Sequence, residues 1–179
     1  SIFKKSKGSI VCLLDRDDFF HKSKIKKILK VFQKNRGINF VQNLPYIKGK
    51  KKFKKTNKNN PMSFWPYLAP ESCISFRKRF MIDFLRVNKK YSNKFENVWM
   101  GFRMGVHSFF NQKSFYTLSE NLTFYESLGE SKKYQFLGKN WFKRRNDSFD
   151  YLKKILKRSM SLNYNLDYLI TKFLTSFYK

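Results

Sequence analysis

The excess of positive charge constrains this chain more than any other feature. Its 179 residues include 39 Lys and Arg against 12 Asp and Glu, which gives a formal net charge of +27. A compact globule with so much charge of one sign repels itself unless a negatively charged partner neutralises it. The balance therefore predicts a polyanionic partner, and a nucleic acid is the usual one.

Residue usage indicates an ordered protein with biased coding. Hydrophobic residues make up 41% and aromatic residues 19% of the chain, which is enough to build a core and excludes a compositionally disordered protein. Ala69 is the only alanine, whereas Phe, Lys, Asn, Ile, Leu and Tyr, which have A- and T-rich codons, abound. This usage predicts an A+T-rich organellar genome and a mitochondrial location, and the same bias accounts for part of the lysine excess.

Apolar spacing predicts a helix-rich α+β fold. Residues recur at i, i+3, i+4 and i+7 in four segments, which is the pattern of amphipathic helices. These predicted helices span 21–35, 73–90, 148–159 and 164–177. β-Branched and aromatic residues predict a short strand over 9–14 and a small strand region over 97–127. The amphipathic helices are expected to pack around this strand region, with long basic extensions outside it.

The segment 48–70 separates two parts of the predicted organisation. It combines a lysine-rich run with three prolines, Pro61, Pro66 and Pro70, and its first half is too polar to order itself in water. We expect an N-terminal basic arm, strand and helix over 1–47, a lysine- and proline-rich extension over 48–70, and a helix, strand region and helical hairpin over 71–179. No run of about 18 uncharged apolar residues exists, so no transmembrane segment is expected, nor a cleavable signal peptide.

Residues that could carry chemistry are few. Asp15, Asp17 and Asp18 are the only clustered acids, and they precede a predicted helix whose start they could cap. Cys12 and Cys73 lie far apart and neither pairs with a histidine at metal-binding spacing, so two small buried hydrophobes are expected. We therefore predict no catalytic residue, no metal, no cofactor and no small-molecule substrate, and the chain is not expected to be an enzyme.

Basic residues interleaved with aromatics predict an RNA-binding surface. Lysines neutralise phosphates and release counterions, and aromatics such as Phe53, Phe64, Trp65 and Trp141 could stack on unpaired bases. The predicted RNA-binding residues are Lys48, Lys50, Lys51, Lys52, Lys54, Lys55, Lys58, Arg77, Arg79, Arg103, Lys143, Arg144 and Arg145.

The segment 101–105 carries a family resemblance. Its sequence, Gly-Phe-Arg-Met-Gly, resembles the Gly-Phe-Arg-Leu-Gly motif near the start of small-subunit ribosomal protein three. Phe110 and Asn111 would replace that family's Trp-Asn pair, and Phe115 would match a later aromatic. The resemblance implies tight backbone turns close to RNA at both glycines and a phosphate contact for Arg103. It also implies a divergent or split form, because the family's Asn-Pro before the motif and its later Gly-x-x-Gly loop are missing.

These observations together predict a structural protein of the mitochondrial ribosome, in the matrix and in the small subunit. Its partners would be ribosomal RNA and neighbouring ribosomal proteins, and the isolated chain would be poorly soluble. Two alternatives stay open. One is an accessory subunit of a mitochondrial inner-membrane complex, whose lysines meet anionic headgroups. The other is an intron-encoded nuclease or maturase that uses Asp15, Asp17 or Asp18.

Overall fold

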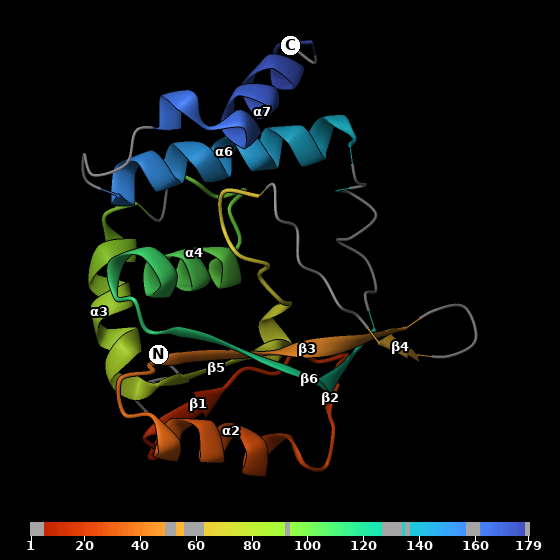
Figure 1. The fold of residues 1–179 in the computed structure, drawn as a ribbon, viewed down its shortest axis with the longest axis vertical. Coiled ribbons are helices and arrows are strands. Elements are labelled where there is room, and N and C mark those ends of the chain that lie inside the picture. Colours follow the sequence, from red (N-terminus) through yellow and green to blue (C-terminus); the bar gives the residue numbers. More distant parts are fainter. Residues whose placement is uncertain are drawn as a thin grey trace.

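A six-stranded mixed sheet forms the centre of the molecule (Figure 1). The computed structural model describes residues 6–48, 63–91, 94–126, 134, 137–156 and 162–177, and the backbone of 53–55. The strands follow one another across the sheet in the order β1 (Ile10–Cys12), β5 (Ile74–Arg77), β3 (Phe40–Lys48), β6 (Phe115–Tyr125) and β2 (Phe19–Phe20), and β4 (Phe53–Lys55) pairs with β3. β3 and β6 run parallel, whereas every other pair is antiparallel.

The prediction of a helix-rich fold with only a small strand region is wrong. β3 and β6 are nine and eleven residues long and lie side by side in the middle of the sheet. The predictions missed β3 because it contains Gln42, Asn43 and Pro45, which are unfavourable in an ordinary strand. The buried Gln42 amide donates to the Tyr67 carbonyl oxygen at 2.7 Å and accepts from the Ala69 N–H at 2.9 Å, so its burial is compensated.

Helices cover both faces of the sheet. α2 (Lys24–Lys34) lies on one face, and α3 (Lys78–Lys89) and α4 (Met100–Val106) lie on the other (Figure 1). Successive residues of a strand point to opposite faces. Phe40 accordingly packs with the α3 side chain Phe80, whereas its neighbour Val41 packs with Ile28 and Phe32 of α2. The sheet is therefore buried on both faces, and β3 contributes side chains to the hydrophobic core on each side.

Two further helices form an outer layer beyond α4. α6 (Lys139–Ile155) crosses above α4, and α7 (Leu166–Ser176) packs on α6 (Figure 1). Three short helical turns complete the described elements: η1 (Glu71–Cys73), η2 (His107–Asn111) and η3 (Leu162–Tyr164). Among the described helices, none has both the length and the apolar character needed to cross a bilayer.

The predicted elements agree with the structure in part. The segments 21–35 and 164–177 are confirmed as helices α2 and α7, and 9–14 contains strand β1. The segment 73–90 begins with strand β5 and becomes helical only at Lys78, because Ile74 and Phe76 pair into the sheet. The segment 97–127 was predicted as strands, yet it starts with α4 and η2 before β6. The helix predicted over 148–159 is the second half of the longer α6.

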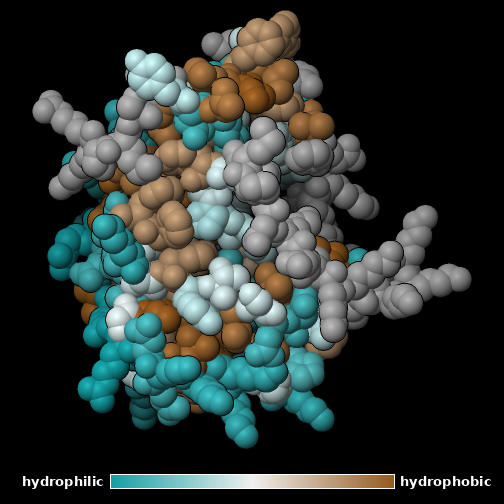
Figure 2. All heavy atoms as spheres, viewed as in Figure 1, coloured by the Kyte–Doolittle hydropathy of each residue, from teal (hydrophilic) through white to brown (hydrophobic). Residues whose placement is uncertain are grey.

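Charged and apolar residues are distributed unevenly over the surface. Figure 2 shows hydrophilic residues gathered around the end of the molecule where α2 lies, and hydrophobic residues at the opposite end, where α7 lies. The division of the chain at residues 47 and 70 stays a prediction. Strand β3 nevertheless reaches Lys48, so the sheet includes the start of the predicted extension.

We expect Gly101→Ala to destabilise the protein. A Cβ atom at this position would lie 2.9 Å from Glu71 Cγ and 3.1 Å from Ile74 Cδ1, so α4 could no longer approach the η1–β5 segment as closely. The loss should be about 1–3 kcal/mol in denaturant unfolding, because overpacking outweighs the helix propensity that alanine adds.

Gly8→Ala is the matched control for this substitution. Among the described residues, a Cβ there would meet only the Ile10 carbonyl oxygen, at an ordinary contact distance of 3.4 Å. Its effect on unfolding should stay within about 0.5 kcal/mol. Equal effects of the two substitutions would contradict the close-packing role of Gly101.

Candidate functional site

The acidic turn, which we define as Asp15–Asp18, follows β1 and is held by two other segments. The Asp15 N–H donates to Ser72 Oγ at 2.8 Å, which ties the turn to η1. Asp18 Oδ1 accepts from the Glu126 N–H at 3.0 Å, which ties it to the end of β6. These bonds replace the helix-capping role that the sequence predicted: α2 begins after Ser23, and neither Asp17 nor Asp18 caps it.

The carboxylates of the acidic turn repel one another. Partial burial and then the negative charges of Asp18 and Asp17 raise the pKa of Asp15 above its usual value. Asp18 is buried, and its Oδ2 atom has no hydrogen-bond partner within the described part of the chain. A cation beside these groups would relieve the repulsion, because an opposite charge stabilises ionised carboxylates.

Lys24 lies buried behind the acidic turn. Its Nζ donates to the Ser72 carbonyl oxygen at 2.5 Å and to Thr123 Oγ1 at 2.9 Å, and it sits 3.8 Å from the centre of the Phe20 ring. Burial lowers the pKa of Lys24 to about 8. The ammonium group thus joins η1 to β6, the same two segments that hold the acidic turn.

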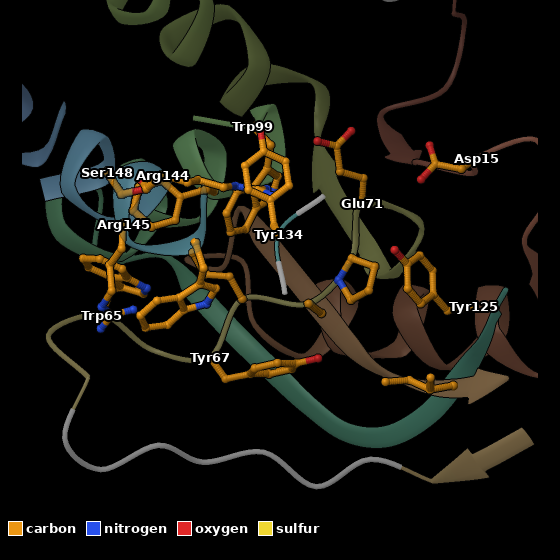
Figure 3. Close-up of a pocket in the computed structure, with 16 residues that line it drawn as sticks. Asp15, Trp65, Tyr67, Glu71, Trp99, Tyr125, Tyr134, Arg144, Arg145 and Ser148 are labelled. Atoms are coloured by element: carbon orange, nitrogen blue, oxygen red, sulfur yellow. The ribbon is translucent and has the colours of Figure 1, made fainter. Parts of the chain in front are cut away.

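A pocket of about 590 Å³ opens beside the acidic turn (Figure 3). Asp15 lies at one end, and Ile47 of β3 and Tyr125 of β6 line the wall close to it. Both residues stand near the carboxyl ends of the two parallel strands, which is where open α/β sheets bind ligands. The volume is within the range of small-molecule sites.

The other end of the pocket is aromatic and cationic. The guanidinium of Arg144 lies 3.9 Å from the Trp99 ring centre and 4.3 Å from that of Tyr134. Arg145 lies 4.5 Å from the Trp65 ring centre and forms an ion pair with Asp167 of α7. Figure 3 shows these side chains on the side of the pocket away from Asp15. Broad aromatic faces of this kind suit a ring-shaped ligand.

The acidic end fits a cation shared with a ligand better than a closed metal centre. Nowhere in the described ranges do three or more His, Cys, Asp or Glu side chains converge to enclose a metal ion. Mg²⁺, however, is commonly bound through one or two carboxylates together with substrate phosphates. Asp15, which lines the pocket, and Asp17 are exposed carboxylates of the same turn with Arg16 between them, so they fit that kind of site.

Six of the thirteen predicted RNA-binding residues have well-defined packing or pairing in the described part of the chain. Lys48 pairs with Glu126 at 2.6 Å, and Arg77 donates to the Phe32 and Ile38 carbonyl oxygens. Arg103 is buried and donates to the carbonyl oxygens of Phe95 and Val98 and to Asn88 Oδ1. Arg79 donates to Asn39 Oδ1 and the Arg36 carbonyl oxygen at the surface, and Lys143 is exposed on α6. Arg103 therefore supports the fold from inside, and among the predicted residues whose side chains are described only Arg144 and Arg145 reach the pocket.

The other predicted RNA contacts belong to the lysine-rich segment 48–70. Lys50, Lys51, Lys52 and Lys58 lie outside the described residues, and only the backbone of Lys54 and Lys55 is described, within β4. Three of the aromatics predicted to stack on bases pack against protein: Phe64 stacks on Phe110, Trp65 meets Phe102 edge to face, and Trp141 meets Phe142 edge to face. The side chain of Phe53 lies outside the described residues.

Glu71 and Tyr125 were not predicted as site residues, and Asp15 was named only for the nuclease alternative. The signal at Asp15 was that three carboxylates directly follow a predicted strand, and helix capping was the interpretation preferred for them. Glu71 and Tyr125 carried no such signal, because they are isolated in the chain and meet in the pocket only through the sheet. Neither cysteine forms a disulfide, and the expectation of burial is confirmed for Cys73, whereas Cys12 is only partly buried.

Arg103→Lys should destabilise the protein by about 2–4 kcal/mol, because a lysine cannot serve all three acceptors and would leave a buried charge poorly paired. Arg79→Lys, at an exposed site, should cost less than about 1 kcal/mol in the same denaturant titration. A small effect at Arg103 would show that its side chain is free to contact a partner.

Lys24 should add a pH dependence to stability. Its folded pKa of about 8 lies below its ordinary value of 10.5, so the unfolded state binds more protons between these values and stability rises with pH there. From pH 8 to 10 the wild type should therefore gain about 2 kcal/mol relative to Lys24→Met in denaturant unfolding. Comparing the two proteins cancels groups that they share, such as Cys73. A difference that is constant with pH would contradict the burial of a charged Lys24.

Comparison with known proteins identifies the family. The model of glycosyl transferase family 2 matches residues 1–119, about two thirds of the chain. No curated protein matches the sequence. The matched range includes the acidic turn, α4 and the start of β6. It also includes residues 63–70, which we call the strap.

The family match corrects the functional predictions. It includes the motif at 101–105, so the resemblance of that motif to small-subunit ribosomal protein three is wrong. It also contradicts the structural role in a ribosome, the membrane-complex and nuclease alternatives, the ribosomal RNA and protein partners, and the expectation of a non-enzyme without a small-molecule substrate. From residues 1–119, which carry most of the sheet and the acidic end of the pocket, we conclude that the chain belongs to glycosyl transferase family 2.

Proposed function

We propose that this protein transfers a sugar from a sugar-nucleotide donor to the hydroxyl group of an acceptor. The observation that carries the proposal is the position of Asp15, which lies at the end of a pocket where the parallel strands β3 and β6 finish. Family membership supplies the reaction class. The pocket supplies a place for it, with carboxylates at one end and aromatic faces at the other.

The acidic end fits the phosphates of the donor through a shared divalent cation. Asp15 and Asp17 would hold the cation, which when bound neutralises the charge that develops on the departing phosphate. The crowding of carboxylates supports this assignment, because burial and the neighbouring acids raise the pKa of Asp15 when no cation is present. Ser72 and Glu126 fix the backbone and the Asp18 side chain of the turn, so the two ligands are held in place.

The transfer breaks the bond between the sugar C1 and the phosphate oxygen and forms a bond between C1 and the acceptor oxygen. The phosphate leaves with the electron pair, and the acceptor hydroxyl must give its proton to a base. Glu71 is the second carboxylate that lines the pocket, and its Oε1 accepts from the Gly101 N–H at 2.8 Å. This bond orients the carboxylate, so we assign Glu71 the role of proton acceptor.

The aromatic wall supports transfer to an acceptor over hydrolysis. Trp65, Trp99 and Trp141 line the pocket together with the guanidinium groups of Arg144 and Arg145. Apolar faces bind the faces of sugar rings and exclude water that would otherwise compete with the acceptor. The mitochondrial location stays a prediction from residue usage and is independent of this activity.

Asp15→Asn should weaken donor binding without harming the fold. Loss of one charge removes a cation ligand, so the affinity for a nucleoside diphosphate in the presence of Mn²⁺ should fall at least about tenfold in calorimetric titration. Thermal stability should be equal or slightly higher, because the substitution relieves repulsion that solvent only partly screens.

Glu71→Gln should separate binding from chemistry. Its nucleoside diphosphate affinity should match the wild type, while the rate of sugar transfer, followed by released nucleotide with a panel of donors and acceptors, should fall by about 100-fold or more. Asp83→Asn, an exposed acid on α3 outside the pocket, is the control and should leave both quantities unchanged. Wild-type nucleotide affinity in Asp15→Asn would refute the proposed donor site.

A further inference from the structure

Helix α7 packs on the protein through its polar side. Thr171 is buried, and Asp167 accepts hydrogen bonds from Arg145 of α6 and, at 2.9 Å, from the Phe64 N–H. Tyr168 packs edge to face on Phe149, with the ring centres 5.3 Å apart. A surface helix normally buries its apolar side, so this orientation is inverted.

The apolar side of α7 faces outward. We call the residues Leu166, Leu169, Ile170, Phe173 and Phe177 the outer stripe, and all five are exposed. Their spacing of i, i+3, i+4, i+7 and i+11 places them on one face of the helix. Leu166, Phe173 and Phe177 retain 67%, 63% and 69% of their surface. Figure 2 shows the resulting hydrophobic area at the end of the molecule where α7 lies.

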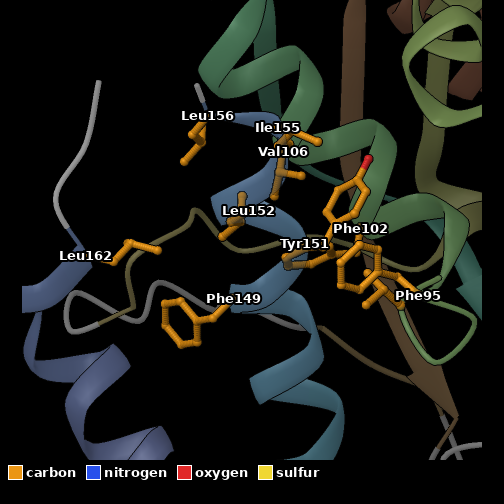
Figure 4. Packing of buried hydrophobic residues seen from close by; sticks show 10 residues of the cluster. Phe95, Phe102, Val106, Phe149, Tyr151, Leu152, Ile155, Leu156 and Leu162 are labelled. Carbon is orange, nitrogen blue, oxygen red and sulfur yellow. The ribbon is translucent and has the colours of Figure 1, made fainter. Parts of the chain in front are cut away.

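The residues of the outer stripe do not belong to the hydrophobic cluster that lies beneath α7. Figure 4 shows Phe149, Leu152 and Ile155 of α6 pointing into the cluster that also contains Phe102, and Leu162 joins it just before α7 begins. From α7 only Tyr168 packs against this cluster within the described residues. The sequence predicted that the two C-terminal helices pack as a hairpin. That pairing exists, but through the polar side of the helix.

A contiguous exposed apolar face of this kind indicates an interaction surface. A second copy of the chain is a poor occupant, because each copy carries a net charge of +27 and the two would repel. An anionic lipid bilayer has an apolar interior and a negatively charged surface. The interior matches the outer stripe, and the charged surface matches the net positive charge of the chain.

We propose that α7 docks this enzyme onto an anionic membrane, with the outer stripe inserted at the boundary between headgroups and acyl chains. The helix has 11 residues and spans roughly 16 Å, so it lies along the interface and does not cross the bilayer. Lys153 and Lys154 are exposed on the last turn of α6, and Lys153 donates to Tyr168 Oη at 2.5 Å, so this turn lies beside α7, where Lys154 can meet the headgroups. This docking does not depend on the sugar-transfer chemistry of the pocket.

Co-sedimentation of the full chain with vesicles tests the proposal. The protein should bind vesicles that contain phosphatidylglycerol and bind pure phosphatidylcholine vesicles much more weakly. Phe173→Asp should lower partitioning into the anionic vesicles by at least about tenfold, because it places a charge in the centre of the outer stripe. Ile82→Asp is the matched control, since Ile82 is 61% exposed on α3, and it should bind within about twofold of the wild type.

Three outcomes would overturn the proposal. One is a wild-type chain that does not bind anionic vesicles. The second is equal binding by Phe173→Asp and Ile82→Asp, which would make the attraction purely electrostatic. The third is a wild-type dimer in analytical ultracentrifugation that Phe173→Asp dissociates, which would assign the outer stripe to a second copy. Circular dichroism verifies folding, and Leu166→Asp replaces Phe173→Asp if the latter unfolds. No sugar substrate is needed, so this result is separate from that of the pocket variants.

Discussion

The parallel pairing of β3 with β6 is the constraint on which the rest of the structure depends. The two strands come from distant parts of the chain, and their register shifts between Asn43 and Pro45, where β6 accommodates the irregularity. The Asn121 side chain donates to the Pro45 carbonyl oxygen at 2.6 Å, so the interruption is stabilised by a specific bond. Because both strands end at the pocket, an error in this pairing would separate Ile47 from Tyr125 and dismantle the site.

The same strand also positions the pocket wall that follows it. Gln42 is bonded through its amide to Tyr67, Ala69 and Thr117, so one buried side chain attaches the strap 63–70 to the sheet. The strap then places Trp65 against Phe102 and Phe149. A polar residue in the core is costly unless every group is satisfied, and here the bonds it makes determine the shape of the site.

Local periodicity predicted the helices that pack by an ordinary amphipathic pattern, such as α2, where Ile28 and Phe32 are buried. It failed where tertiary contacts decide the local structure. Gln42, Asn43 and Pro45 made β3 unrecognisable, because the partners that satisfy them lie far away in sequence. The resemblance implied tight backbone turns at the glycines of 101–105, yet both lie inside helix α4, and Gly101 allows this helix to approach Glu71 closely. The net charge suggested RNA as the partner. Composition gives the number of lysines, however, and not their positions and contacts in the folded protein.

The ion pair between Arg145 and Asp167 has a consequence for how this enzyme could be rebuilt. Asp167 also binds the backbone of Phe64, so one carboxylate near the end of the chain fastens α6, α7 and the strap around a site whose acidic half lies in residues 1–119. Residues 1–119, which match the family model, therefore do not form the whole site by themselves. A chimera that grafts it onto a foreign C-terminal region would inherit the carboxylates and lose the fastening that shapes the opposite side of the cavity.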